Sequence, residues 1–365
     1  MPSVAVRILH PDLDPAAGSL GAWVHDVRGR LAEHHRRGFV DAQADDVTIV
    51  SGPPDRRSFG DRLQRLIEPR SGAPGGLVVL GSGSIPLATA ADRRAFVSAA
   101  QGDRRQVLAN NYYSADVVAI SRIDSLPSIP ALPSDNALPR WLDEVVGYPV
   151  EDLRARWRLG FDIDGPLDLV LLGVGTPLEL DLGQVGSRLA ASRAVAGDPR
   201  AELLVSGRTS ATALGWIEGH AAARVRAWVE ERGLHAGSRL AQAAERGDVG
   251  ASRARPPRSV LGTLLDRDGP GALGDHLARF ADAALVDTRV LLAHHLGSDP
   301  SDWPSPEDRA ASDLLLAERI ADPWLRELTQ SAIDAPIPIL LGGHTLVGPG
   351  VRMVIDGPPA SLPWT

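Results

Sequence analysis

The chain contains neither cysteine nor lysine. Without cysteine, disulfides, thiolate catalysis and Cys-ligated zinc are excluded. All 38 basic residues are therefore arginine, which also excludes a Walker A lysine and a Schiff-base lysine. Any contact with an anion must come from arginine, from a helix N-terminus or from a bound metal ion.

Long apolar runs and a positive net charge are missing as well. No apolar run of about 18 residues occurs and no basic, apolar leader opens the chain, so we expect a cytoplasmic protein with no membrane partner. The formal net charge of -8 argues against nucleic acid as a partner. With 365 residues, 44% of them hydrophobic and 23% charged, the chain is typical of an ordinary globular protein of two domains.

The first half alternates strand and helix patterns. Apolar runs predict strands at 4–9, 46–50, 75–80 and 116–120, and helical spacing begins at Ser19 and at Thr89. Such an order indicates an α/β fold, with a mainly parallel sheet flanked by helices. Ligands of these sheets bind beyond the carboxyl ends of the strands, so Ser84, in the loop after residue 80, lies where a site is expected.

The first half ends in the most informative stretch, in which Asp162, Asp164 and Asp168 surround a Gly-Pro turn. Asp162 and Asp164 alternate along an extended run and therefore lie on the same face. Two close carboxylates are costly without a cation between them, which makes the pair a candidate for handling a divalent metal ion or a phosphate. The alternative is that Asp164 or Asp168 caps the helix that begins at Pro166.

Two further polar groups accompany this stretch. Asn110 and Asn111 enter the strand at 116–120 and offer amide donors and acceptors, although a polar turn is the alternative. Arg158, with Arg154 and Arg156, would give the two carboxylates a basic rim.

Together these segments resemble the nucleotidyltransferase-like glycosyltransferase-A fold over residues 1–172. Its members include the guanylyltransferases of molybdenum-cofactor and deazaflavin-cofactor synthesis and related bacterial glycosyltransferase-A-like proteins. The segments that carry the resemblance are Phe59-Gly-Asp-Arg-Leu63, Gly81-Ser-Gly-Ser84-Ile-Pro86, Asn110-Asn-Tyr-Tyr-Ser-Ala-Asp116, and Asp162-x-Asp164-x-Pro166-x-Asp168-Leu. The last of these is the most specific.

The resemblance implies a nucleotide or nucleotide-sugar bound with Mg²⁺ or Mn²⁺ for nucleotidyl or glycosyl transfer. Asp162 and Asp164 would be catalytic and Asp164 would hold the metal ion, while Ser84, Asn110, Asn111 and Arg158 would contact the substrate. Ser84 stands where the family has an aspartate, and a hydroxyl is a poor ligand for a hard dication. The family's Gly-rich N-terminal loop, with its Arg and Lys, is also missing. We therefore expect a degenerate site with altered or lost chemistry.

The second half matches no family pattern, and a turn at 173–177 predicts domains at 1–173 and 174–365, the second α/β or helix-rich. Predicted strands at 202–206, 283–286 and 337–341 each run into a polar junction. If these strands are parallel, one edge of the sheet gathers a second anion site. Its residues are Arg208, Thr209, Ser210, Asp287, Arg289 and His344. Alternatively, Thr209 or Ser210 simply caps a long helix predicted at 207–233.

The sequence leaves three hypotheses open. The first is a transferase-like protein that binds a nucleotide or nucleotide-sugar with a divalent ion. The second is an inactive nucleotidyltransferase-like scaffold whose C-terminal domain binds a small anionic metabolite. The third is a structural partner protein, and an oligomer is possible. A polar stretch at 241–258 is predicted to be a mobile connection or an arginine-bearing lid.

Overall fold

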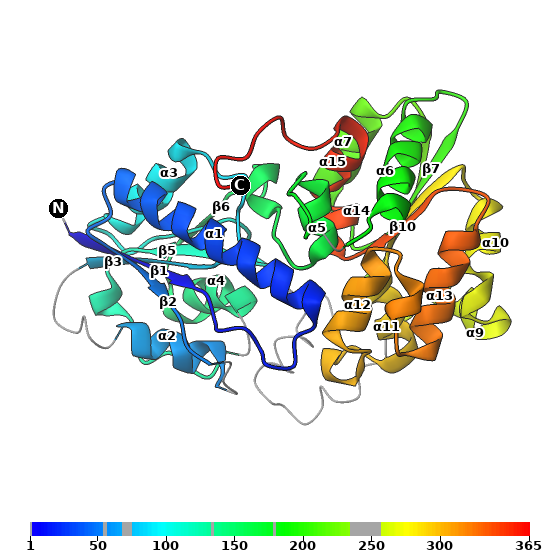
Figure 1. The fold of residues 1–365 in the computed structure, drawn as a ribbon. Helices are drawn as coiled ribbons and strands as arrows, with labels where there is room; N and C mark the ends of the chain where they lie inside the picture. Colours follow the sequence, from blue (N-terminus) through cyan, green and yellow to red (C-terminus); the bar gives the residue numbers. More distant parts are fainter. Residues whose placement is uncertain (1, 54–56, 68–74, 133–134, 178–179, 234–256) are drawn as a thin grey trace. The chain divides into compact units, whose positions relative to one another are not determined.

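A computed structural model describes residues 2–53, 57–67, 75–132, 135–177, 180–233 and 257–365 (Figure 1). Contacts within the chain group it into two compact units. The N-terminal unit comprises Met1–Ala16, His25–Ile163 and Pro363–Thr365, and the C-terminal unit comprises Ala17–Val24 and Asp164–Leu362. These units are defined by contacts alone, so the division into domains at residue 173 stays a prediction.

The N-terminal unit contains a six-stranded sheet in the order β2-β1-β3-β5-β4-β6. The strands are β1 Ser3–Leu9, β2 Asp46–Val50, β3 Gly75–Gly81, β4 Val107–Ala109, β5 Val117–Ile120 and β6 Val150–Asp152. β5 runs antiparallel to both of its neighbours, β3 and β4, whereas the other pairings are parallel. The sheet is therefore mixed. The α/β class is confirmed, and the expectation of a mainly parallel sheet holds except at β5.

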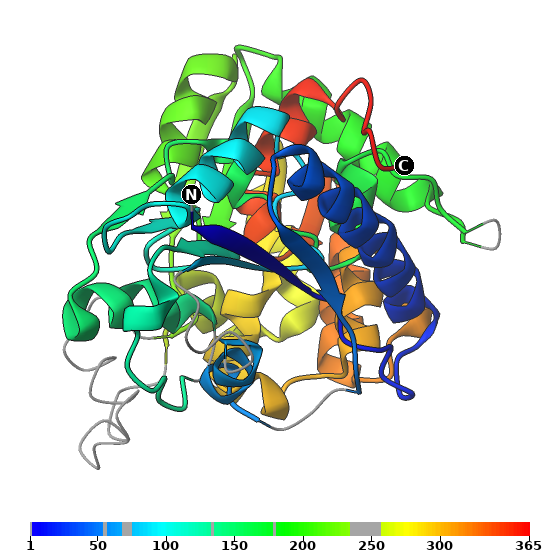
Figure 2. The same cartoon turned by 90° about the vertical axis from the view of Figure 1, so that its left-hand side faces the viewer.

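Helices cover both faces of this sheet. The helix α1 (Ser19–Asp41) and α3 (Ala90–Ala100) lie on one side, and α2 (Phe59–Ile67) and α4 (Leu138–Trp141) lie on the other (Figure 2). Alternate residues of β1 explain the two layers, because Val6 packs with Phe39 and Phe96 on one face while Ala5 packs with Leu63 and Leu138 on the other. The core of this unit therefore lies in two layers, one on each face of the sheet.

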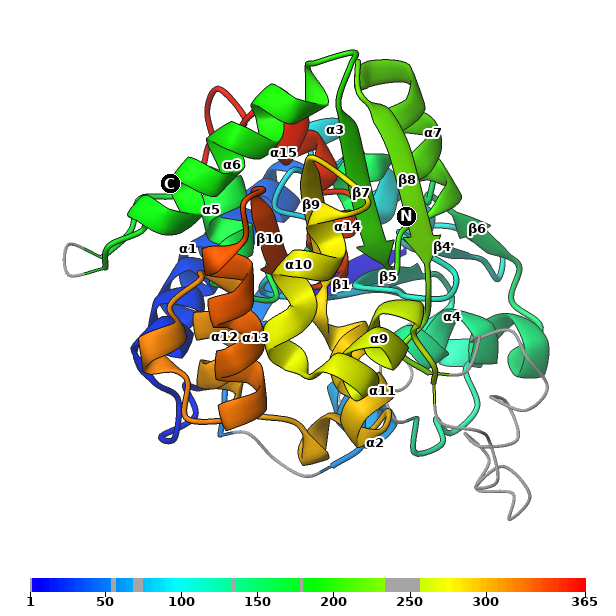
Figure 3. The same ribbon diagram turned by 90° about the vertical axis from the view of Figure 1, so that its right-hand side faces the viewer.

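The C-terminal unit is built on a four-stranded sheet in the order β10-β9-β7-β8 (Figure 3). The strands are β7 Glu202–Gly207, β8 Arg224–Val229, β9 Ala283–Asp287 and β10 Ile339–Gly342. All three pairings are parallel. Because the strands run the same way, every carboxyl end lies at one edge of the sheet.

Helices flank this second sheet. They are α5 Pro166–Leu171, α6 Gly183–Ala196, α7 Ala211–His220, α9 Val260–Asp268, α10 Leu273–Ala278, α11 Thr288–Leu296, α12 Pro306–Asp313, α13 Pro323–Asp334, α14 His344–Val347 and α15 Val351–Asp356. Among the described residues, no helix has both the length and the apolarity needed to cross a membrane.

The long helix predicted at 207–233 is wrong. The helix α7 ends at His220, and the segment after Ala223 forms the edge strand β8. Its alternation of Arg224 and Arg226 with Val225 follows the period of a strand, and Trp228 packs edge-on against Phe280, with ring centroids 5.4 Å apart. Apolar residues at approximate helical spacing therefore misled the prediction. Of the stretch predicted at 241–258, residues 241–256 lie outside the described part of the chain.

Candidate functional site

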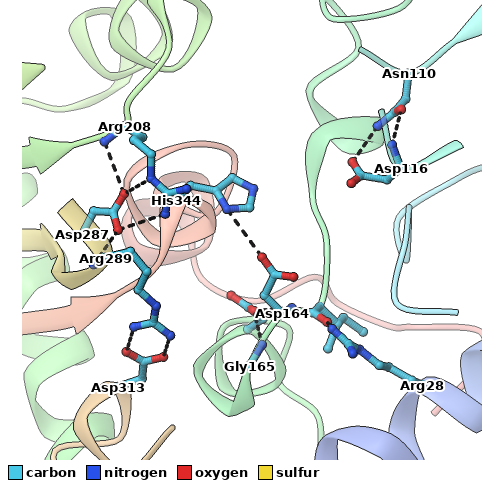
Figure 4. Close-up of polar contacts among 12 residues, drawn as sticks. Arg28, Asn110, Asp116, Asp164, Gly165, Arg208, Asp287, Arg289, Asp313 and His344 are labelled. Atoms are coloured by element: carbon cyan, nitrogen blue, oxygen red, sulfur yellow. Dashed lines mark hydrogen bonds and ion pairs between the residues drawn. The ribbon is translucent and has the colours of Figure 1, made fainter. Parts of the chain in front are cut away.

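The carboxyl ends of three adjacent parallel strands bring the predicted polar junctions of the C-terminal unit together. β7 ends at Gly207, β9 at Asp287 and β10 at Gly342, in the order β10-β9-β7. Gly207 has a φ of +129°, and a Cβ there would overlap the Cβ of Asp287, so only glycine allows this close approach. The expected convergence of Arg208, Asp287, Arg289 and His344 at one edge is confirmed (Figure 4).

Asp287 organises the junction between β7 and β9. Its buried carboxylate accepts hydrogen bonds from Arg208 Nε at 2.6 Å and Nη2 at 3.1 Å, and from the backbone N–H of Arg289 at 3.1 Å. Burial alone would raise the pKa of Asp287, but the charge and hydrogen bonds of Arg208 hold this pKa below its usual range. Asp287 is therefore an ionised carboxylate that fixes the position of Arg208.

A second buried ion pair lies beside the first. Arg289 donates from Nη1 to Asp313 Oδ1 at 2.5 Å and from Nη2 to Asp313 Oδ2 at 2.6 Å, in bidentate geometry. Burial would lower the pKa of Arg289, but the charge of Asp313 outweighs it and raises the pKa above its ordinary value. Asp313 lies at the end of α12 and was not among the predicted site residues.

His344 reaches the same edge from the turn after β10. Its Nδ1 lies 3.5 Å from Oδ2 of Asp164. Burial and the charge of Arg208 lower the pKa of His344, although Asp164 opposes this effect. The imidazole is consequently neutral at pH 7 and can accept a hydrogen bond or a proton.

Asp168 acts as a helix cap, as the alternative interpretation predicted. Its Oδ2 accepts the backbone N–H groups of Asp164 and Gly165, both at 2.8 Å, just before Pro166 opens α5. Burial, reinforced by the charge of Asp164, raises the pKa of Asp168 to about 8. The buried carboxyl group therefore keeps its proton at neutral pH, which is unusual for a cap.

Ser210 and Thr209 have separate roles. The Ser210 hydroxyl accepts the backbone N–H of Ala213 at 3.1 Å and caps α7, so the capping alternative is confirmed for Ser210. Thr209 is buried, and its Oγ1 has no hydrogen-bond partner among the described residues. The Ser210 hydroxyl therefore serves the helix cap. The Thr209 hydroxyl, on the residue after Arg208, is buried without a partner among the described residues.

In the N-terminal unit, Ser84 and Asp162 form an isolated antiparallel bridge. Ser84 is buried, and its carbonyl oxygen accepts a hydrogen bond from Nε2 of His35 at 2.9 Å. Arg28 donates from Nε to the carbonyl oxygen of Ile163 at 2.7 Å. The segment that ends this unit is therefore extended, as predicted, and is anchored to the loop after β3.

Asn110 is a structural residue. It is buried, and its amide group donates to Asp116 at 2.9 Å and to the carbonyl oxygen of Leu159 at 2.8 Å while its oxygen accepts two backbone N–H groups (Figure 4). The oxygen of Asn111 accepts the backbone N–H groups of Tyr113 and Ser114. The polar-turn alternative thus accounts for both side chains.

Arg154, Arg156 and Arg158 do not form the predicted basic rim around Asp162 and Asp164, because they pair with other carboxylates. Arg158 and Arg156 pair with Asp92, at 3.5 and 3.0 Å, and Arg154 pairs with Asp152 at 2.5 Å. Asp92 itself completes the capping box of α3 with Thr89. These three arginines therefore tie the segment that contains β6 to α3 and to itself.

The residues predicted to hold a divalent ion do not gather into a set of ligands. Within the described ranges, no group of three or more His, Asp or Glu side chains is arranged so that it could hold a metal ion. The Ser84 carbonyl is committed to His35, and Asp164 faces His344. Magnesium or manganese binding therefore remains a prediction from the resemblance alone, and no chemical step is assigned to it.

A cavity of about 240 Å³ lies in the N-terminal unit, at the carboxyl ends of β1 and β3. Apolar side chains dominate its wall, together with three charged ones: Leu9, Phe59, Val79, Leu80, Ala115 and Val118 with Arg62, Asp116 and Asp135. Ser84, Asn110 and Asn111 are not among the described residues that line it.

No protein-family model matches this chain, and no curated protein matches it either. What the protein does must therefore follow from the geometry of its own residues. Of the residues predicted for the two sites, those of the C-terminal unit converge on one point, whereas Asn110, Asn111 and Arg158 hold turns and segments of the N-terminal unit in place.

Proposed function

We propose that the protein binds a small anionic metabolite at the carboxyl edge of the sheet formed by β7, β9 and β10. One observation carries this proposal: three parallel strands deliver Arg208, Arg289 and His344 to one edge, where ligands of α/β sheets bind. The N-terminal unit then serves as a nucleotidyltransferase-like scaffold without catalysis.

Arg208 is the residue best prepared to contact the ligand. Asp287 occupies its Nε and Nη2 and leaves the Nη1 donors for a ligand. The guanidinium is held in place before binding, so little side-chain entropy is lost when an anion arrives. The neutral His344 supplies an uncharged hydrogen-bonding group at the same edge.

A panel of small anions in thermal-shift and calorimetric titrations tests this proposal. We expect inorganic phosphate, pyrophosphate or a di- or tricarboxylate to stabilise the wild-type protein. The Arg208→Lys variant keeps the charge but loses the planar fork, so affinity should fall by about tenfold, the equivalent of about 1.4 kcal/mol. The Arg200→Gln variant removes an arginine whose side chain is 88% exposed and which lies outside the site, so it should bind as the wild type does. If no anion of the panel binds, or if Arg208→Lys binds normally, the proposed site is wrong.

The second candidate is nucleotide binding by the N-terminal unit, with Mg²⁺ or Mn²⁺ and a nucleotidyl- or glycosyl-transferase activity, as the resemblance implies. The cavity at the carboxyl ends of β1 and β3 favours it. Its volume of about 240 Å³ lies just below the ~300 Å³ at which ligand pockets usually begin. A group as compact as a base would fill it, with Arg62 and Asp116 at its wall.

Titration with each nucleoside triphosphate, in Mg²⁺ and then in Mn²⁺, decides this candidate. We expect a nucleotide to bind, and we expect Ala115→Leu to weaken this binding because the larger side chain takes up space in the cavity. Arg208→Lys, in the other unit, is the matched control and should not change nucleotide affinity. Failure of every nucleotide to bind with either ion removes the candidate.

A further inference from the structure

Two arginines that the sequence did not single out lie near the proposed anion site, one beyond the strand that pairs with β7 and one a single helical turn before Asp313. Arg232 follows β8, the fourth strand, and Arg309 belongs to α12. Their guanidinium carbons lie 5.8 and 5.7 Å from the ring centroid of the same residue, Trp303. The indole N–H of Trp303 donates to the carbonyl oxygen of Gly297 at 2.8 Å, which fixes the ring. One anchored aromatic ring thus positions both cations.

Neither guanidinium is neutralised by the part of the chain that the structure describes. Arg208 and Arg289 have carboxylate partners in Asp287 and Asp313, but no described carboxylate lies within ion-pair distance of Arg232 or Arg309. Both side chains are half-buried. Burial, followed by the charge of a neighbouring arginine, lowers the pKa of each. The fold therefore holds two positive charges beside one aromatic ring, at a cost in free energy.

We propose that Arg232 and Arg309 form a phosphoryl-binding pair, so that the ligand of the anion site is a phosphorylated metabolite. This inference rests on the proposed function and narrows its ligand class. A phosphomonoester carries a charge of about -1.5 to -2 at pH 7 and three acceptor oxygens, whereas a carboxylate carries one charge. Two guanidinium groups match the charge of a phosphoryl group, and each planar fork can donate to two of its oxygens.

The charge of Asp164, which acts on Arg232 together with that of Asp287, does not remove the need for a dianion. Asp164 has a side chain that is 55% exposed and faces His344. Water and salt screen an exposed charge of this kind, so it compensates the two half-buried guanidiniums only weakly. Arg208, already fixed by Asp287, completes the set of donors around the phosphoryl group.

The experiment compares two classes of probe on single-residue variants. Inorganic phosphate and glycerol phosphate are titrated by calorimetry against acetate and succinate, with wild type, Arg232→Gln and Arg309→Gln. We expect both phosphates to bind more tightly than either carboxylate, and each variant to lose about tenfold or more in phosphate affinity. Arg279→Gln removes an exposed arginine that precedes β9, at the other end of the strand, and should bind as wild type does.

Ligand-free stability separates a binding role from a structural one. Arg232 repels Arg208, and Arg309 repels Arg289. Because each substitution relieves one of these repulsions, Arg232→Gln and Arg309→Gln should melt at the same temperature as wild type or higher. A lower melting temperature with unchanged phosphate affinity overturns the inference. If carboxylates bind as tightly as phosphates and only Arg208→Lys weakens them, the phosphoryl assignment is wrong and the proposed anion site stands. If no anion binds, both are wrong.

Discussion

Replacing Arg289 with methionine is expected to lower the free energy of unfolding by about 3–5 kcal/mol, the cost of leaving one member of a buried ion pair alone. Asp313, the partner of Arg289, has a side chain that is only 3% exposed and accepts both guanidinium hydrogen bonds. Without Arg289, Asp313 must stay buried either as a carboxylate that has lost its hydrogen-bonded partner or as a protonated acid, and both cost free energy. Urea denaturation at neutral pH, followed by circular dichroism, measures the change.

Two control variants test whether burial of the ion pair causes this loss of stability. Arg200→Met breaks a pair whose arginine side chain is 88% exposed, so the change in the free energy of unfolding should be small beside that of Arg289→Met. The double variant Arg289→Met with Asp313→Leu removes both charges and should recover most of the loss. A single Arg289 variant as stable as Arg200→Met would mean that the ion pair is not buried as described.

The Asp168→Asn variant is expected to change how stability depends on pH. In the folded protein the pKa of Asp168 is about 8, against an ordinary value of 3.8. Between these values the folded state holds a proton that the unfolded state has released, so stability falls as pH rises from about 4 to about 8. At about 1.36 kcal/mol for each pKa unit, the loss amounts to several kcal/mol.

Asparagine keeps the acceptor oxygen for the N–H groups of Asp164 and Gly165 but has no charge to gain. We therefore expect wild type and Asp168→Asn to be about equally stable near pH 4 and the variant to be clearly more stable near pH 8. Asp164→Asn removes the second cause of the raised pKa and should flatten the slope in part. Parallel curves for wild type and Asp168→Asn, from denaturant titrations across this pH range, would contradict the assignment.

The convergence of the C-terminal junctions could be predicted from sequence because it depends on strand direction alone. Apolar runs located β7, β9 and β10, and the residues that follow parallel strands must meet at one edge. The helix caps could also be predicted, since Ser210 directly precedes a helical pattern and Asp168 lies in the first turn of another. Local spacing was sufficient in both cases.

The remaining features depend on long-range contacts that no local pattern specifies. Arg309 and Arg232 meet at Trp303 from segments far apart in the chain, and Arg232 was assigned to a helix that does not exist. Asn110 offers the same donors to a ligand as to the fold, and only the structure reveals that Asp116 and Leu159 take them. Sequence can therefore nominate polar residues, but it does not tell which of them the fold has already used.

Titration of the arginine side-chain Nε–H resonances with inorganic phosphate, followed by ¹⁵N NMR, tests the anion site most directly. The geometry predicts that Arg208, Arg232 and Arg309 shift together with one dissociation constant, while the exposed Arg200 and Arg279 stay in place. If only exposed arginines respond, or if the shifts map to Arg62 at the cavity of the N-terminal unit, the C-terminal sheet edge does not bind the anion.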